Sequence, residues 1–180
     1  MRNTERPTAE LHGIYRDVLY DSIGQVLWDR GWKSNAIVGD CRRLLATFMG
    51  GTSPSLGIQG LRVGMGLDSW DATGAPAATA SQAALVDTNS FKVLPASLQI
   101  DFLDGGGIVS PNPTNRLQIV ATLGPHVPSW PDANHVTTNL REFGLIGSLK
   151  GAETLINYVT HPVIVKDPLS TLTRTIWLTF

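Results

Sequence analysis

The chain has little of what holds many small extracellular or membrane proteins together. Its 180 residues include one cysteine, and no apolar run is longer than four residues. A single cysteine cannot form an intrachain disulfide, and Cys41 stands among apolar residues, where a buried packing role is expected. No segment is long enough to span a membrane, and the polar N-terminus lacks the apolar core of a signal peptide. We therefore expect synthesis and folding in a cytoplasm.

Charge is also scarce. Charged residues make up 16% of the chain, and 14 Lys and Arg residues nearly balance 15 Asp and Glu residues. Nucleic-acid binding usually needs a clustered positive face, and no basic run is present, so a nucleic-acid partner is not expected. A largely uncharged surface suits a protein that lies against neighbours. It equally suits a compact β protein that is rich in Thr, Ser and Gly.

Motifs that would indicate catalysis or a cofactor are missing. Gly64 and Gly66 begin a G-x-G pattern, but the third glycine of a dinucleotide-binding loop is replaced by Ser69. No G-x-S-x-G nucleophile motif occurs. We predict no catalytic residue, no cofactor and no metal site. One alternative stays open, a metal-dependent hydrolase that uses His126, Asp132 and His135 in a Pro-rich loop.

The chain does contain many short strand patterns and one helix pattern. Two apolar runs in residues 14–32 flank a bend at Gly24, which predicts an N-terminal hairpin. Helical spacing of apolar residues predicts a helix over 40–49, with Asp40 as its N-cap and glycines at its end. The segment 71–86, rich in Ala and Thr, is predicted to be a mobile loop. Further strands are predicted at 60–65, 96–103, 116–124, 140–149, 154–167 and 171–180, with 140–149 breaking at Gly144 and Gly147; His161 is expected near a strand end.

These elements predict a mainly β fold, an antiparallel β-sandwich or jelly-roll-like domain over residues 13–180, preceded by an extended arm at 1–12. In the last strand, 171–180, mostly apolar residues at even positions alternate with mostly threonine residues at odd positions. Its inward row is predicted to contain Leu172, Ile176, Leu178 and Phe180. Arg174 interrupts that row, so we place it near the start of the strand, where its head reaches water or a carboxylate.

Five tryptophans are many for this length, and tryptophan is enriched at protein contacts. We take all five as interaction candidates, while expecting at least half to pack in the core: Trp28, Trp32, Trp70, Trp130 and Trp177. Trp177 shares the outward parity of the last strand and therefore needs a cover. Either the N-terminal arm or a neighbouring subunit could supply that cover.

Several short motifs resemble those of structural proteins in phage tails and tail-like contractile injection particles. An Asn-Ile-Val-type segment before a short helix, a V-G-x-G strand end, an E-x-G-L-I-G element and a terminal alternating strand follow one another. The matching residues are Asn35, Ile37, Val38, Val63, Gly64, Gly66, Glu142, Gly144, Leu145, Gly147 and the strand 171–180.

The resemblance implies a non-enzymatic structural subunit, incorporated in a virion or injection particle as a collar, cap, baseplate or fibre component. It also implies a homo-oligomer, as a threefold or sixfold ring or an adaptor, that contacts other particle proteins. The alternative is a carbohydrate- or receptor-binding β-sandwich module of a tail fibre, with Trp130 and the loop of Asp132 and His135 as its contact site.

Overall fold

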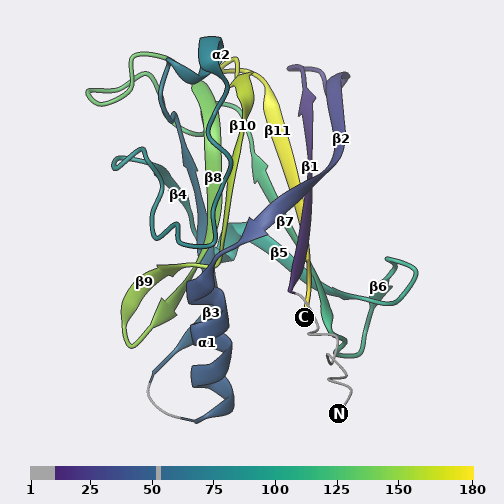
Figure 1. Ribbon diagram of the computed structural model, residues 1–180. Coiled ribbons are helices and arrows are strands. Elements are labelled where there is room, and N and C mark those ends of the chain that lie inside the picture. Colours follow the sequence, from purple (N-terminus) through teal and green to yellow (C-terminus); the bar gives the residue numbers. More distant parts are fainter. Residues whose placement is uncertain (1–10, 52–53) are drawn as a thin grey trace, which may run out of the picture.

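The computed structural model describes residues 11–51 and 54–180, and it confirms a mainly β fold with one longer helix (Figure 1). The strands are β1 (His12–Tyr20), β2 (Val26–Ile37), β3 (Leu56–Gly64), β4 (Phe91–Val93), β5 (Leu98–Leu103), β6 (Val109–Ser110), β7 (Arg116–Leu123), β8 (Asn139–Leu149), β9 (Ala152–Leu155), β10 (Asn157–Val165) and β11 (Thr171–Thr179). The helices are α1 (Gly39–Met49), the short α2 (Trp70–Thr73) and a 3₁₀ turn at Pro95–Ser97.

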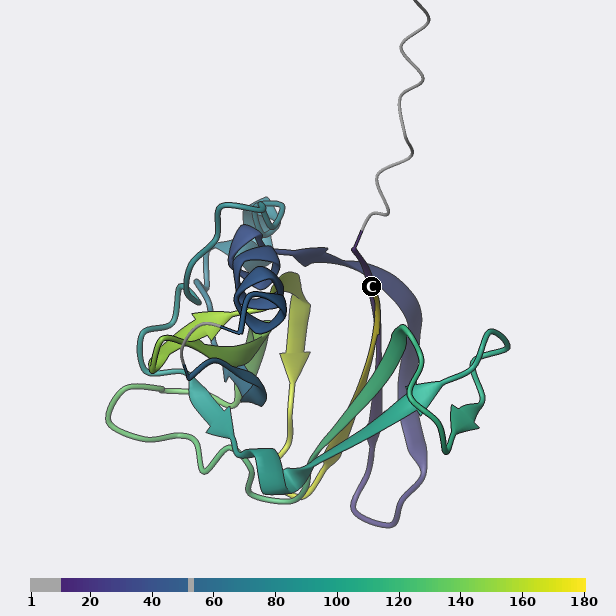
Figure 2. The ribbon, with the colours of Figure 1, turned by 90° about the horizontal axis from the view of Figure 1, so that it is seen from below.

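The strands form one antiparallel sheet in the order β4-β3-β8-β10-β2-β1-β11-β7-β5-β6, with β9 paired to β8. The sheet curls, so that the half containing β8 and β10 faces the half containing β1, β11 and β7 (Figure 2). Side chains from both halves fill the space between them, and the rings of Tyr15 and Phe143 meet edge to face across it at 5.1 Å. The layered arrangement expected of a sandwich is thus made by a single continuous sheet.

The curl depends on β2, which connects the two halves. Pairing between β2 and β10 covers only Ala36 with Tyr158 and Ile37 with Asn157. Beyond these pairs the Arg30 side chain donates to the main-chain oxygens of Pro162 and Val163, each at 2.7 Å. Proline has no N–H to offer a neighbouring strand, so Pro162 suits this edge of β10. A guanidinium group therefore bridges the place where main-chain pairing stops.

The N-terminal hairpin forms as predicted. Gly24 has a φ of +82°, and the Asp21 carboxylate accepts hydrogen bonds from the amides of Ile23 and Gln25. A left-handed residue at this point favours glycine. Most of the predicted arm, residues 1–10, lies outside the described residues. His12 already belongs to β1, where it pairs with Thr179, so the boundary of the arm falls earlier than residue 12.

Helix α1 matches the predicted span, but its N-cap is Val38 and not Asp40. Asp40 lies in the first turn and forms an ion pair with Arg43, while Cys41 and Leu44 are buried. Burial raises the pKa of the Cys41 thiol to about 11. A thiol in that state is a weak nucleophile, and the predicted packing role is confirmed by its burial.

The predicted breaks in 140–149 are wrong, because β8 runs without interruption through Gly144 and Gly147. A Cβ on Gly144 would stand 2.6 Å from the main-chain oxygen of Asn157, and one on Gly147 would stand 2.8 Å from that of Gly57. These glycines let neighbouring backbones approach the strand closely. They mark tight packing of the sheet instead of strand ends.

The Ala- and Thr-rich segment begins with α2 and continues without regular structure. It is attached at several points: Thr160 donates its hydroxyl to the oxygen of Pro76, Gly39 donates its amide to the oxygen of Ala80, and Val86 donates its amide to Glu142. That the segment is mobile stays a prediction.

Candidate functional site

The five tryptophans occupy different environments. Trp70 and Trp130 are buried, and Trp28 is half-buried beneath Arg30, whose guanidinium carbon lies 4.6 Å from the ring centroid. Trp32 keeps 39% of its surface exposed. Only Trp32 and Trp177 are brought together among the described tryptophans, with ring centroids 4.5 Å apart.

Trp177 finds its cover within its own chain. Its indole N–H donates to the side-chain oxygen of Gln118 at 2.9 Å, and Trp32 packs against its ring. The β5–β6 turn covers it further, since a Cβ on Gly107 would stand 2.8 Å from the indole. The described residues that cover Trp177 come from β2, β7 and this turn. Trp32 is therefore the more exposed member of the pair.

The pair stands on the outer face of β2, β1, β11 and β7. Strand register places Ile14 beside Trp177, Arg16 between Trp32 and Thr175, and Val18 beside Thr173. Arg16 forms an ion pair with Asp29, and hydrogen bonds from Arg16 lower the pKa of the Asp29 carboxyl to about 2. Around this pair the outward row of β11 is otherwise threonine, and the adjoining row of β7 carries Thr122, Val120, Gln118 and, at its end, Arg116. Most of these side chains are uncharged, so little charge has to be desolvated on contact.

A second cluster of polar side chains, made by Arg174, Asp17 and His161, lies inside the curled sheet. The prediction for Arg174 is wrong. That side chain is fully buried, not near water at the start of the strand. It donates two hydrogen bonds of 2.7 Å to the Asp17 carboxylate, and its guanidinium carbon lies 3.7 Å from the Phe143 ring centroid. Burial would raise the pKa of Asp17, but the charge and hydrogen bonds of Arg174 hold that pKa below its ordinary value.

His161 completes this group, although the sequence suggested an ordinary strand-end residue. Its Nδ1–H donates to the oxygen of Pro162 at 2.9 Å, so Nε2 accepts from Arg174 at 3.0 Å. Burial, together with the charge of Arg174, lowers the pKa of His161 to about 3. The ring is therefore neutral in the folded protein at physiological pH.

The neutral state of His161 predicts a loss of stability in acid. Below pH 6.5 the imidazole of His161 is protonated in the unfolded chain, whereas in the folded chain it stays neutral until about pH 3. Above pH 6.5 the neutral ring therefore costs the folded state nothing. Below it, the free energy of unfolding falls by about 1.4 kcal/mol per pH unit as the pH drops toward 3. Urea unfolding from pH 7 to pH 4 measures this slope.

The His161→Gln variant keeps an acceptor for Arg174 but does not titrate, so its stability profile should be flatter than that of the wild type. His126→Asn is the matched control, because His126 is exposed and Asn tolerates its φ of +58°. A His161→Gln profile as steep as the wild-type profile would contradict the prediction.

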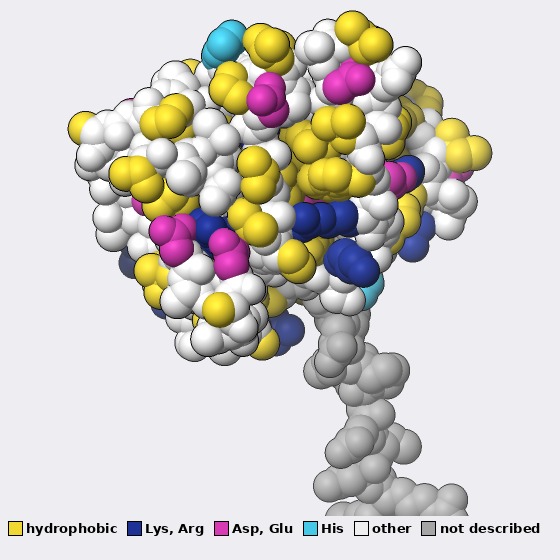
Figure 3. Space-filling model, turned by 90° about the horizontal axis from the view of Figure 1, so that it is seen from above, with side chains coloured by type: hydrophobic (Ala, Val, Ile, Leu, Met, Phe, Trp, Pro, Cys, Tyr) yellow, Lys and Arg dark blue, Asp and Glu magenta, His cyan; other side chains and the backbone are white. Residues whose placement is uncertain are grey.

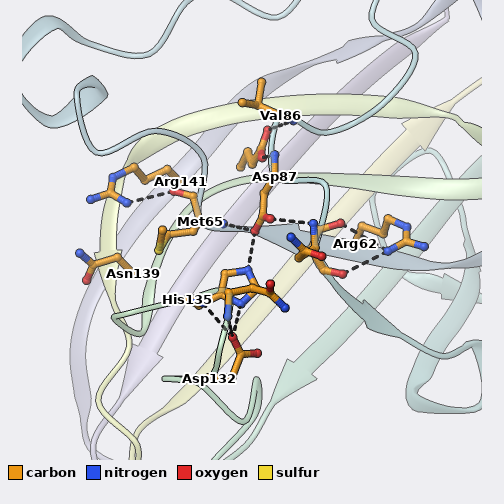
Figure 4. Close-up of polar contacts among 12 residues, drawn as sticks. Arg62, Met65, Val86, Asp87, Asp132, His135, Asn139 and Arg141 are labelled. Atoms are coloured by element: carbon orange, nitrogen blue, oxygen red, sulfur yellow. Dashed lines mark hydrogen bonds and ion pairs between the residues drawn. The ribbon is translucent and has the colours of Figure 1, made fainter.

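The third polar group joins two loops (Figure 4). His135 Nδ1 lies 2.9 Å from Asp132 Oδ1, and Nε2 lies 3.0 Å from Asp87 Oδ2. The ring stacks on Trp130 at 3.8 Å. Partial burial opposes ionisation of Asp132, but hydrogen bonds from the amides of Asn134 and His135 and from the imidazole hold its pKa below the ordinary value.

This arrangement does not match the metal-ligand set of the alternative hypothesis, a metal-dependent hydrolase. Both ring nitrogens of His135 face carboxylates, and His126 is exposed, with its amide bonded to the oxygen of Pro168. In residues 11–51 and 54–180, no group of three His, Cys, Asp or Glu side chains is placed to hold a metal ion. The pair of His135 and Asp132 instead fastens the Pro-rich loop to the segment around Asp87.

Glu142, from the E-x-G-L-I-G element, holds the segment around Asp87 against β8. Its carboxylate accepts hydrogen bonds from the amides of Val86 and Asp87 and from the Tyr158 hydroxyl. A Cβ on Gly64 would stand 2.7 Å from this carboxylate, which gives a physical reason for the glycine of the V-G-x-G strand end. The neighbouring Arg141 bonds to Asp71 at 2.8 and 2.6 Å and not to Glu142. Sequence reasoning had no local signal for these contacts.

Comparison with protein-family models, with curated protein sequences and with solved structures gave no match. No helix in the described part of the chain is long and apolar enough to cross a membrane.

Proposed function

We propose that the chain is a non-enzymatic structural subunit of a phage tail or contractile injection particle. In this role it assembles through protein–protein contacts, with further copies of itself and with other particle proteins, as part of a ring or adaptor. The observation that carries the proposal is the outer face of β2, β1, β11 and β7. Its Trp32–Trp177 pair lies among mostly uncharged side chains, next to the ion pair of Arg16 and Asp29.

The surface chemistry supports assembly. Seen from the end that carries α2, apolar side chains form several patches between scattered charged groups (Figure 3). Contacts between large proteins gain most from apolar and aromatic area that is freed from water, and charged groups oppose them through desolvation. A half-exposed indole held against a second indole is rigid before contact, so little side-chain entropy is lost when a partner covers it.

The internal polar groups support a structural role as well. Arg174, Asp17 and His161 bond to one another inside the sheet, and His135 is engaged on both sides by carboxylates. Glu142 accepts from two amides and a hydroxyl. These side chains fix loops and strands in place, which suits a rigid building block.

The glycan-binding alternative loses its proposed contact residue. Trp130 is 7% exposed and its ring is stacked on His135, so it offers no open face to a sugar. Trp70 is also buried. We therefore keep one candidate function.

Particles isolated from the organism that encodes the chain test the proposal. We expect mass spectrometry to find the protein in fixed ratio to the other components. Trp32→Ser should reduce incorporation while leaving the melting temperature within a few degrees of wild type, since Trp32 is partly exposed. Val165→Ser, at another exposed apolar residue, is the matched control and should incorporate normally. A protein that never enters particles would contradict the proposal.

A further inference from the structure

The imidazole of His135 lies between two carboxylates from different segments of the chain (Figure 4). Its side chain is 3% exposed. Nδ1 lies 2.9 Å from Asp132 Oδ1, in the Pro-rich loop of residues 124–138, and Nε2 lies 3.0 Å from Asp87 Oδ2, in the segment before β4. An ionised carboxylate only accepts hydrogen bonds, and a neutral imidazole has one N–H to donate. A neutral ring would therefore turn the lone pair of one nitrogen toward a carboxylate oxygen.

The other contacts of both carboxylates favour their ionised forms. Asp87 Oδ2 also accepts from the amide of Met65, and its Oδ1 accepts from the amide two residues further along the chain, each at 2.9 Å. Asp132 Oδ1 accepts from the amides of Asn134 and His135 at 2.7 and 2.8 Å. Several N–H donors stabilise the charged form of a carboxyl group. The proton that completes the second contact therefore belongs to the ring, which makes His135 an imidazolium.

Two further groups around the ring favour a positive charge. Trp130 stacks on it, with ring centroids 3.8 Å apart, and the face of an indole attracts a cation. The Glu142 carboxylate of β8 accepts from the amide of Asp87 at 2.7 Å, so a third carboxylate lies near the ring. Nearby negative charges favour the protonated form of a base.

The two arginines labelled beside this cluster are bound to other carboxylates (Figure 4). Arg141 of β8 pairs with Asp71, and Arg62 of β3 pairs with Glu153. Within residues 11–51 and 54–180, no Lys or Arg side chain forms an ion pair with either carboxylate that contacts His135. The imidazolium therefore supplies their counter-charge.

We propose that His135 is a pH-dependent link: as an imidazolium it ties the Pro-rich loop to the segment around Asp87, and the loss of one ring proton in alkaline solution loosens that tie. A neutral ring can donate to only one of the two carboxylates, and at the other the lone pairs of nitrogen and oxygen repel each other. The inference does not depend on the proposed function.

The direction of this pH dependence is opposite to that of His161. The link stabilises the folded chain in full below about pH 6.5, where a free imidazole is also charged, and this stabilisation declines as the pH rises above that value. His161 is neutral in the folded chain above about pH 3, so its contribution does not change above pH 6.5. A loss of stability above pH 6.5 therefore distinguishes His135 from His161.

Nitrogen-15 NMR of the imidazole rings, with the full chain at pH 7.5, tests the charge state directly. The chain has four histidines, and the spectrum of His135→Gln assigns the resonances of His135. A free imidazole is about 90% neutral at this pH. We expect both ring nitrogens of His135 to carry a proton. One protonated and one bare nitrogen would overturn the proposal.

Urea unfolding between pH 6.5 and pH 9 tests the effect on stability. The unfolding equilibrium constant of the wild type, relative to that of His135→Gln, should rise by up to about tenfold per pH unit, because the folded chain keeps a proton that the unfolded chain has lost. His126→Asn, at an exposed histidine of the same loop, is the matched control and should follow the wild type. Lys166, whose pKa is lowered to about 8 by burial, is present in every variant and cancels in the comparison. A ratio that stays constant over this range would overturn the link.

Backbone order parameters from NMR test the loosening itself. Those of residues 132–136 should fall from about 0.85 to below about 0.6 as the ring of His135 loses its proton. Asp132→Asn keeps an oxygen that accepts from Nδ1 but removes one negative charge, so its ring should lose the proton at a lower pH than the wild type does. Order parameters that stay unchanged while the ring loses its proton would overturn the proposed loosening of the loop.

Discussion

Deleting residues 176–180 is expected to abolish folding. Residues 176–179 form the second half of β11, which pairs with β1 on one side and with β7 on the other, and Phe180 follows the strand. The deletion removes the buried side chains of Ile176 and Leu178 and the ring of Trp177. Losing one buried Ile or Leu costs about 2–5 kcal/mol. The lost main-chain bonds on both sides of the strand add to this, and a typical domain has only about 5–15 kcal/mol of stability.

Far-UV circular dichroism and thermal melting of the shortened chain measure this effect, and we expect no cooperative transition. Deleting Phe180 alone is the control, because that residue is 37% exposed and sits beyond the end of β11. It donates its amide to the oxygen of Asn115 and lines an apolar pocket beside α1, so a modest loss is expected. A chain lacking 176–180 that still melts cooperatively would make the strand peripheral, against the register observed here.

Local patterns made several elements predictable. The hairpin, α1 and β11 were identified because period-2 and period-3.6 spacings and turn glycines are read from neighbouring residues. Leu172, Ile176 and Leu178 are buried as predicted, although Phe180 is partly exposed. The closure of the sheet was not predictable in this way. It depends on Arg30 meeting the oxygens of Pro162 and Val163, more than 130 residues away.

The glycines of β8 illustrate an ambiguity that one sequence cannot resolve. A glycine within a strand pattern marks either an interruption or a close approach of another backbone. At Gly144 and Gly147 the second reading holds, because the oxygens of Asn157 and Gly57 occupy the space that a Cβ would need. The approaching segments lie on other strands, so the pattern around each glycine contains no sign of them.

Among the candidate site residues, parity alone placed Trp177 on the outer face, but it could not identify Trp32 as its neighbour. The sequence gives a weak indication of the buried ion pair. Asp17 and Arg174 both interrupt inward apolar rows, and two opposite charges at inward positions of two strands would satisfy each other only if those strands were adjacent. The observed register places Asp17 opposite Arg174.

That pair leads to the last expected result. Asp17→Leu or Arg174→Met should each destabilise the protein by about 3–5 kcal/mol, because each leaves a buried charge without its counter-charge. Both side chains are fully buried. The double variant Asp17→Leu/Arg174→Met removes both charges and should recover much of that loss, since apolar residues of similar volume often replace a buried ion pair without net cost.

Urea unfolding at pH 7 of the wild type, both single variants and the double variant measures the coupling between the two residues. Arg16→Met in the exposed pair with Asp29 is the matched control, and it should cost far less than either buried variant because solvent screens that pair. Additive losses in the double variant would show that the interior does not couple these charges. In that case the stabilising effect of Arg174 would come from its cation–π contact with Phe143 and not from its ion pair with Asp17.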